Sequence, residues 1–195
     1  IITRFLLWKK ERILQVFGGI GLVLLLWTFG YFGTSVYSWF GNVFDLSEYR
    51  GLDATAYLEN VFSEDAGAIR WLDETIEGQS VVLEANGDSY SDYERVSAMT
   101  GLPTVLGWYV HEWLWRGDPA DLNVRAEDVK QMYTSTDTNE VLRLLEQYHV
   151  TYIFVGSKEK EKYGDALNES LLQSIGDIVY QDTASGTYIL QVQDT

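Results

Sequence analysis

The chain has 195 residues, a formal net charge of −15 and no cysteine. This length suffices for one domain with a buried core plus an additional element. The lack of cysteine excludes disulfides, thiolate metal ligands and a cysteine nucleophile. The chain starts at Ile1 without an initiator methionine, so we expect either a processed protein or a fragment of a longer one.

The charge is unevenly distributed along the chain. Residues 1–44 carry four basic side chains and one acidic side chain, a surplus of +3, whereas the other residues carry ten basic and 28 acidic side chains, a net charge of −18. A nucleic-acid backbone requires clustered Lys and Arg, so nucleic acid is not an expected partner. An anionic membrane surface would also repel this acidic region, apart from the basic N-terminal tip.

No residue between Ile13 and Phe44 is charged. About 20 apolar residues in a helix cross a hydrocarbon core of ~30 Å, so this segment predicts a transmembrane helix over about residues 13–38. Aromatic residues near its end suit the water interface, and the basic cluster at residues 9–12 should stay cytoplasmic. We therefore expect an integral membrane protein in which residues 1–44 form a cytoplasmic tip and membrane helix, and residues 45–195 form an extracytoplasmic domain.

Two alternatives to a membrane helix remain open. A signal peptide has a shorter apolar core and a small-residue cleavage site, whereas this run is long and ends in aromatic residues. A buried helix of a soluble protein seldom continues for about 30 residues without a charge. Gly18, Gly19 and Gly21 either allow another helix to approach closely or reflect the general frequency of glycine in membrane helices.

Helical and strand patterns alternate after a polar connector. Strands are predicted at residues 81–85, 151–155, 178–180 and 187–192, and the last two are expected to pair as a hairpin. Helices are predicted at residues 53–60, 63–77, 123–133, 138–148, 158–163 and 166–175. This alternation predicts an α/β domain with a small mixed sheet flanked by helices, parallel in part and antiparallel at its C-terminal edge.

The densest group of unusual residues lies between Glu84 and Gly117. This segment contains three of the seven tryptophans, one of the two histidines and two arginines. If residues 107–116 are helical, one face carries the side chains of Trp108, His111, Glu112 and Trp115. Arg116 then lies one turn beyond Glu112 and is expected to pair with it.

Two interpretations of this segment compete. In the functional one it forms a pocket for a sugar or a phosphate: indole rings suit the apolar faces of sugar rings, and Arg95 and Arg116 bind phosphate oxygens through their planar forks. His111 or Glu112 would then transfer a proton. In the structural one the tryptophans fill the core or rest at the membrane interface, while Arg116 pairs with Glu112.

Other motifs point less clearly to chemistry. A metal site is not expected, because His111 and Glu112 are adjacent instead of being at helical ligand spacing. The carboxylates of Glu84, Asp88 and Asp92 form either an acidic site or a solvated turn. Residues 168–170, Asn-Glu-Ser, match the N-glycosylation sequon, a short pattern with many false positives.

The same segment resembles a known family. The stretch Val-Leu-Glu-Ala-Asn-Gly-Asp-Ser-Tyr at 82–90, Arg-Val-Ser at 95–97, Thr-Gly-Leu-Pro-Thr-Val-Leu-Gly-Trp at 100–108, His-Glu at 111–112 and Trp-Arg-Gly at 115–117 resemble the C-terminal part of the YYY family of archaeal and bacterial integral membrane proteins. The resemblance covers most of residues 50–192. It implies a many-helix membrane architecture similar to that of C-type (GT-C-like) glycosyltransferases, which use sugars carried on polyprenyl phosphates.

The resemblance sets the functional expectation. It implies the C-terminal extracytoplasmic domain of a polytopic, glycosyltransferase-like enzyme, with the main catalytic acid in an outer loop before this chain and no activity of this chain alone. The expected partners are the lipid bilayer, the remaining transmembrane helices and a polyprenyl-phosphate sugar. No cofactor is expected in this part, and a divalent metal in the whole enzyme is left open.

The site residues are assigned as candidates. The catalytic candidates are His111 and Glu112. The candidate substrate-binding residues are Arg95, Trp108, Trp115, Arg116, Asp88 and Tyr90. The alternative function is a non-catalytic carbohydrate-binding or assembly domain that caps a transmembrane bundle.

Overall fold

The computed structural model describes residues 4, 12–42, 45, 47 and 55–193. The chain divides into two compact units, Ile1–Asp53 and Ala54–Thr195. Most of the basic cluster at residues 9–12 and the start of the helix predicted at 53–60 lie outside the described residues. The domain boundary expected after residue 44 stays a prediction.

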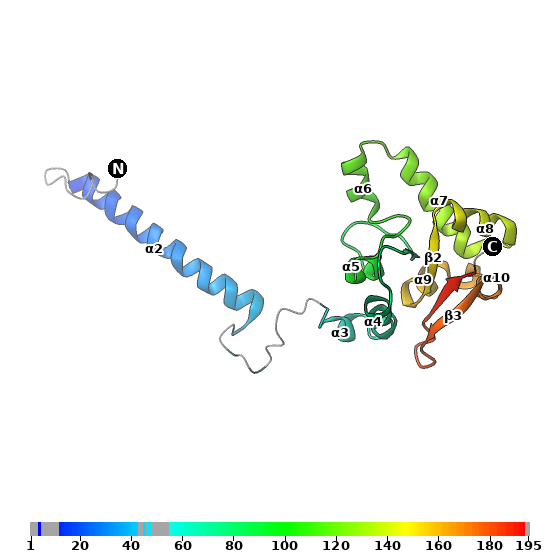
Figure 1. Cartoon of the computed structure of the whole chain (residues 1–195). Coiled ribbons are helices and arrows are strands. Elements are labelled where there is room, and N and C mark those ends of the chain that lie inside the picture. The colour runs from blue at the N-terminus through cyan, green and yellow to red at the C-terminus, as the bar shows by residue number, and fades with distance from the viewer. Residues whose placement is uncertain (1–3, 5–11, 43–44, 46, 48–54, 194–195) are drawn as a thin grey trace. The chain divides into compact units, whose positions relative to one another are not determined.

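The first unit contains helix α2 (Arg12–Phe40), shown in blue in Figure 1. Its segment Gln15–Phe40 has 26 residues and is long and apolar enough to cross a membrane. At 1.5 Å per residue it measures about 39 Å, compared with a hydrocarbon core of ~30 Å. The hydroxyls of Thr28 and Thr34 donate to backbone carbonyls one turn earlier, so these polar groups are satisfied within the helix.

The second unit contains a four-stranded mixed sheet in the order β1-β2-β4-β3. Strand β1 (Val81–Leu83) is parallel to β2 (Val150–Val155). Strand β4 (Tyr188–Val192) is antiparallel to both β2 and β3 (Gly176–Gln181). The predicted mixed sheet, with an antiparallel hairpin at the C-terminal edge, is thereby confirmed.

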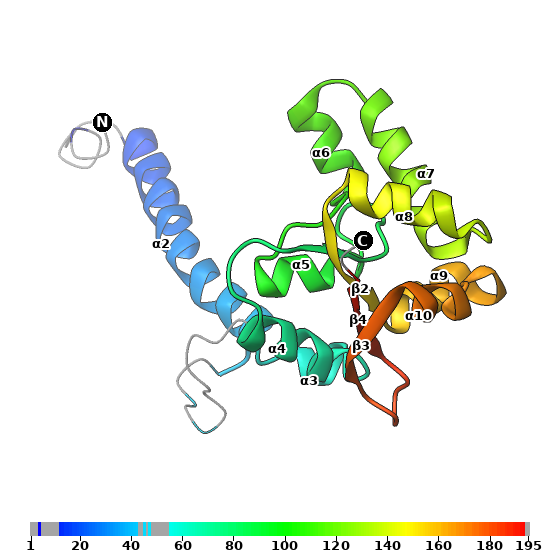
Figure 2. The same cartoon turned by 45° about the vertical axis from the view of Figure 1, so that its right-hand side comes forward.

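Helices flank this sheet on both sides (Figure 2). Their bounds are α3 Leu58–Val61, α4 Ala66–Thr75, α5 Arg95–Thr100, α6 Tyr109–Arg116, α7 Ala120–Thr134, α8 Thr138–Gln147, α9 Ser157–Tyr163 and α10 Glu169–Ile175, with the short 3-10 helix η2 at Gly164–Ala166. The predicted helices at 63–77, 123–133, 138–148, 158–163 and 166–175 correspond to α4, α7, α8, α9 and η2 with α10. Helix α5 was not predicted.

Alternate strand residues enter two separate cores. Ile153 and Leu190 pack with apolar residues of α7, α8 and α10 on one face of the sheet. Phe154 and Ile189 pack with apolar residues of α3, α4 and α5 on the other face. Because side chains alternate along a strand and both faces are covered, strands β1 and β2 are mainly apolar. The edge strand β3 is more exposed and carries Asp177 and Gln181.

The outer edge of β1 is covered by a segment of the same unit. The backbone N–H of Val82 donates to the carbonyl of Pro103 at 2.9 Å, and Val82 forms a parallel bridge with Thr104. The strand predicted at 81–85 ends at Leu83 because the next backbone groups bond elsewhere. Ala85 N donates to the Glu159 carboxylate at 2.9 Å instead of continuing the ladder.

Candidate functional site

The segment after β1 and the start of α9 lie at the carboxyl ends of the two parallel strands. In open α/β sheets this end is where ligand sites form. Glu159 joins the two strand ends, because its carboxylate accepts from Ala85 N at 2.9 Å and from Gly156 N at 2.9 Å. The candidate site therefore rests on two strand ends whose relative position is fixed by Glu159.

A buried ion network holds Glu159 in place at these strand ends. The Arg95 guanidinium donates to Asp65 Oδ2 from Nε at 2.7 Å and to Glu159 Oε2 from Nη2 at 2.9 Å. The three side chains are at most 1% exposed. Burial opposes the charge of Arg95, but the carboxylates of Glu159 and Asp65 outweigh it and raise the pKa of Arg95. Asp65 also accepts from Ser157 and Thr187.

Arg95 was expected to bind substrate, and the structure gives its guanidinium a different set of partners. It joins α5, α9 and the residue before α4 into one network, below the surface of the unit. A buried guanidinium with two carboxylates has little capacity left for a phosphate. A substrate-binding role of Arg95 stays an untested prediction.

Two further carboxylates shape the loop between β1 and α5. Glu84 accepts from the backbone N–H groups of Val96 and Ser97, each at 2.9 Å, and so caps the start of α5. Glu94 precedes α5 in a left-handed conformation with φ 59°, and its Oε1 accepts from Gly87 N at 2.8 Å. Glu94 Oε2 is buried without a partner.

Burial acts strongly on both of these carboxyl groups. It raises the pKa of Glu84 to about 7 and the pKa of Glu94 to about 8. Hydrogen bonds from the backbone oppose the shift in each case without cancelling it. The raised pKa of Glu94 favours its protonated form, and a protonated carboxyl can donate as well as accept.

A pocket of about 320 Å³ opens beside this loop. Its lining residues come from the loop after β1, from α6 and from α9: Asn86, Gly87, Asp88, Tyr93, Tyr109 and Lys162. Lys162 Nζ donates to Asn86 Oδ1 at 2.9 Å and lies 5.5 Å from the Tyr93 ring centroid. The Tyr109 hydroxyl bonds to Asn123 Oδ1 at 2.8 Å. The walls thus combine aromatic faces with amide, carboxylate and ammonium groups.

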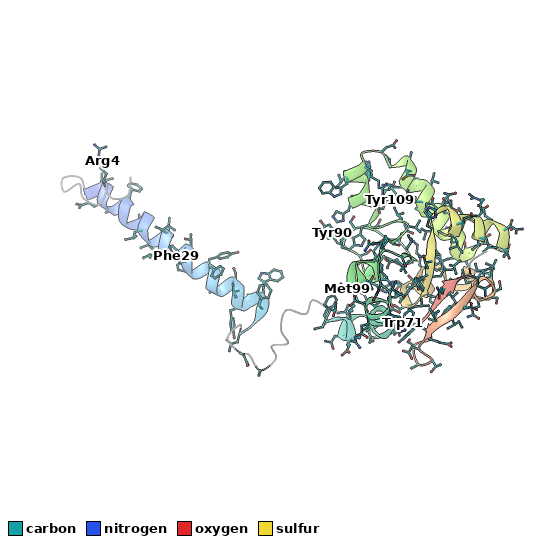
Figure 3. All side chains as sticks on the ribbon, viewed as in Figure 1. Arg4, Phe29, Trp71, Tyr90, Met99 and Tyr109 are labelled. Atoms are coloured by element: carbon teal, nitrogen blue, oxygen red, sulfur yellow. The ribbon has the colours of Figure 1, made fainter. Side chains whose placement is uncertain are left out.

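An aromatic cluster formed by Tyr90, Trp108 and His111 adjoins the pocket walls. The rings of Trp108 and His111 are stacked at 5.2 Å, and Tyr90 meets the His111 ring edge-on at 4.9 Å. The Tyr90 hydroxyl lies 3.3 Å from His111 Nε2. Trp108 Nε1 donates to the carbonyl of the pocket residue Tyr93 at 3.1 Å. Figure 3 shows Tyr90 and Tyr109 on the same side of the unit.

Within this cluster Tyr90 is the exposed member, and its backbone conformation is unusual. Tyr90 has a φ of 63°, in the region that non-glycine residues rarely adopt, and its side chain is 84% exposed. Such an outlier in a loop that carries aromatic and polar groups is typical of a functional segment. Tyr90 therefore offers an exposed aromatic ring at the edge of the site.

The remaining candidate residues lie on α6, and only some of them have the contacts that were predicted. The predicted Glu112–Arg116 pair is confirmed, with Nε donating to Oε2 at 2.9 Å. Glu112 also accepts from Gly107 N at 2.5 Å, and Arg116 lies 3.7 Å from Asp121. Trp115 is 88% exposed and belongs to neither the pocket nor the aromatic cluster. The structure thus brings together Asp88, Tyr90, Trp108 and His111 but not Arg95 or Trp115.

Several residues of the site were missed from the sequence. The sequence did not single out five of them: Asn86, Tyr93, Glu94, Tyr109 and Lys162. All except Lys162 belong to the segment Glu84–Gly117, which was singled out as a whole. Lys162 lies 76 residues from its partner Asn86, so no local pattern points to it. No group of three or more His, Asp or Glu side chains placed to hold a metal occurs in the part of the chain that the structure describes.

Asn168, the first residue of the glycosylation sequon, has a structural role in the fold. Its side-chain amide is not free. Asn168 is the N-cap of α10, where its Oδ1 accepts from Leu171 N at 3.2 Å. Its Nδ2 donates to the carbonyl of Ser135 at 2.9 Å. Both functional ends of the side chain are occupied in the folded unit.

Comparison with known proteins adds a structural likeness. No protein-family model matches the chain, and no curated protein matches it. The structure is similar to the crystal structure of the C-terminal globular domain of an oligosaccharyltransferase from Archaeoglobus fulgidus, with 12% sequence identity and a TM-score of 0.40, covering 65% of this chain and 95% of that chain. A likeness at this level carries no conclusion about site residues, and membership of the YYY family stays a prediction.

Proposed function

We propose that the α/β unit is a carbohydrate-binding domain of a glycosyltransferase-like membrane protein. The observation that carries this proposal is the pocket at the carboxyl ends of β1 and β2, which is extended by the aromatic cluster of Tyr90, Trp108 and His111. Its volume lies at the lower end of the ~300–1,000 Å³ typical of small-ligand sites, which suits a single sugar residue.

The chemistry of the walls favours a sugar. A sugar ring presents an apolar face of C–H groups and a rim of hydroxyls. Exposed aromatic rings cover the face, and groups that both donate and accept bind the rim. Asn86 and Asp88 supply acceptors at the pocket, and Lys162 supplies a donor.

The same walls are poorly suited to a phosphate. Both arginines of the Glu84–Gly117 segment are engaged by carboxylates, and Asp88 lies near the Lys162 ammonium. A phosphate is bound most strongly by free forked guanidinium groups. In the proposed function the sugar of a polyprenyl-phosphate donor, or a sugar acceptor, contacts this pocket, and the phosphate is bound elsewhere in the protein.

The proposed domain positions substrate and does not supply the main catalytic acid. Helix α2 would hold it at the membrane, and the positive surplus before α2 would place it on the extracytoplasmic side. His111 would orient a sugar hydroxyl together with Tyr90, since its Nε2 and the Tyr90 hydroxyl are already within hydrogen-bonding distance. Glu112 stabilises α6 through Gly107 and Arg116.

Sugar binding is tested on the full chain in detergent micelles. Saturation-transfer NMR with a panel of methyl glycosides should show contact with at least one sugar, and Tyr90→Ala should weaken that contact about tenfold or more. Tyr57→Ala removes another exposed tyrosine outside the site and should leave the contact unchanged. No contact with any sugar, or equal contact in both variants, contradicts the carbohydrate-binding proposal.

The link to glycosyl transfer is tested in membranes that contain the protein with all of its native sequence. Transfer from labelled polyprenyl-phosphate sugars should be detectable, and His111→Ala should lower it by roughly 100-fold at matched expression. Arg116→Ala should lower it less, because Arg116 supports Glu112 and α6. Sugar binding without any transfer would favour the non-catalytic carbohydrate-binding alternative.

A further inference from the structure

Helix α6 presents its large apolar side chains to solvent. No residue of this helix is buried, and Trp113, Leu114 and Trp115 are 43%, 71% and 88% exposed. Val110, one turn earlier, is also exposed. In Figures 1 and 2, α6 lies at the end of the α/β unit opposite the β3–β4 turn. Together these four side chains form the α6 tip.

Polar contacts fix the orientation of α6 without covering its tip. Glu112 accepts from Gly107 N at its start and pairs with Arg116 at its end. Tyr109 is bonded to Asn123 of α7. Gly117 ends the helix with φ 79°. The apolar tip is therefore held outward by the fold and is not a consequence of a loose helix.

We propose that the α6 tip inserts into the interface of a zwitterionic phospholipid bilayer. Indole rings have an apolar body and one N–H donor, which suits the headgroup region of a bilayer. Leu114 between the two tryptophans adds apolar surface for the acyl boundary. This inference is independent of sugar binding at the pocket.

The chain itself brings a bilayer within reach of the tip. Helix α2 is long and apolar enough to cross a membrane. Segment 41–57 joins it to α3, and an extended segment of this length spans at most roughly 60 Å. A tethered surface acts at a high effective concentration, so even a small apolar tip gains appreciable membrane occupancy.

The charge around the tip selects the kind of lipid. Asp118 and Asp121 follow α6, and Arg116 is already paired with Glu112 and Asp121. Residues 45–195 carry ten basic and 28 acidic side chains. Anionic lipids would repel such a surface, so insertion rests on apolar contact with neutral headgroups.

The test places a spin label at the tip of the full chain in phosphatidylcholine vesicles. The chain has no cysteine, so Leu114→Cys and Ala184→Cys each give a single labelling site. Ala184 lies in the exposed β3–β4 turn and serves as the control. Collision rates with oxygen and with a water-soluble nickel complex report the depth of the label, and far-UV circular dichroism checks folding.

The expected result is an oxygen-to-nickel collision ratio about fivefold higher at position 114 than at position 184. Adding Trp113→Ser and Trp115→Ser to the Leu114→Cys chain should return the ratio to that of position 184. Replacing half of the lipid with phosphatidylglycerol should lower it. Free access of nickel at position 114 would overturn the proposal, as would exclusion of both reagents, which marks a protein contact. A ratio that is unchanged by phosphatidylglycerol would overturn the choice of a zwitterionic surface.

Discussion

Arg95 and Asp65 form a buried ion pair between positions 30 residues apart, with Nε donating to Oδ2 at 2.7 Å. Glu159 completes the network from a third element. Removing the guanidinium would leave two carboxylates buried without their cation. A buried charge that loses its partner costs far more than the pair itself contributes.

Arg95→Met should therefore lower the free energy of unfolding by about 3–5 kcal/mol. Urea unfolding of the full chain in detergent, followed by circular dichroism, measures this loss. Arg143→Met is the matched control, because Arg143 forms an exposed pair with Glu140 on α8 and its removal should have no measurable effect. Equal stability of the two variants would show that the network does not hold the unit together.

The raised pKa of Glu94 predicts a stability that falls with rising pH. Its folded pKa is about 8, above the ordinary glutamate value near 4.5. Above the unfolded value the unfolded chain releases this proton while the folded chain keeps it. The stability that protonated Glu94 contributes to the folded state is thus fully present below about pH 4.5 and is lost as the pH rises through 8. Glu84, with a pKa of about 7, acts in the same direction.

Glu94→Gln keeps the neutral shape and removes one of these ionisations. The variant should lose roughly 2–4 kcal/mol less stability than the wild type between pH 5 and pH 9. Chemical unfolding across this pH range makes the comparison. Glu161→Gln, at an exposed position of α9, should follow the wild-type curve. A wild-type stability that rises over this range would contradict a protonated Glu94.

Gly156 has no room for a side chain. A Cβ atom there would overlap the Asp65 carboxylate and the Phe154 ring, both of which are fully buried. Gly156→Ala should cost about 2–3 kcal/mol of unfolding free energy and weaken the network around Asp65. Thermal unfolding monitored by circular dichroism is a suitable measurement.

Gly67 offers the opposite case within α4. A Cβ atom there meets the Tyr180 hydroxyl, the far end of a side chain that can turn aside. Since alanine favours a helix over glycine by ~0.5–1 kcal/mol, Gly67→Ala should be at least as stable as the wild type. A loss equal to that of Gly156→Ala would show that the Tyr180 side chain cannot turn aside.

Asn168 should escape glycosylation once the unit has folded. Its side chain caps α10 and bonds to Ser135, so neither end is free for a glycan. Folded, unmodified chain incubated with an N-glycosylating enzyme and its glycan donor should keep the mass of the unmodified sequence. Asn168→Ala should cost about 1 kcal/mol through loss of the cap. A glycan found on Asn168 in folded protein would contradict this geometry.

The architecture was largely predictable because its patterns are local. The apolar run at 151–155 and the helical spacing at 138–148 identified β2 and α8 almost to the residue. The Glu112–Arg116 pair followed from helical spacing alone. Helix α5 escaped prediction because it has six residues and begins after a left-handed Glu94, which no periodicity indicates.

The site was predictable only as a segment. Residues 84–117 carry most of the side chains of the site. Whether each side chain is buried in a network or faces the pocket depends on partners that are distant in the sequence. Arg95 could not be separated from a ligand-binding arginine until Asp65 and Glu159 were placed around it. Lys162 reaches the pocket from α9 for the same reason, through tertiary contact and not through sequence spacing.

The covered edge of β1 bears on how this unit associates with other chains. Because Val82 is already bonded to Pro103 and bridged to Thr104, this side of the sheet cannot template an added strand. The opposite border is β3, where a register irregularity between Ile178 and Tyr180 distorts the ladder. Both borders of the sheet thus resist edge-to-edge aggregation between copies of this unit.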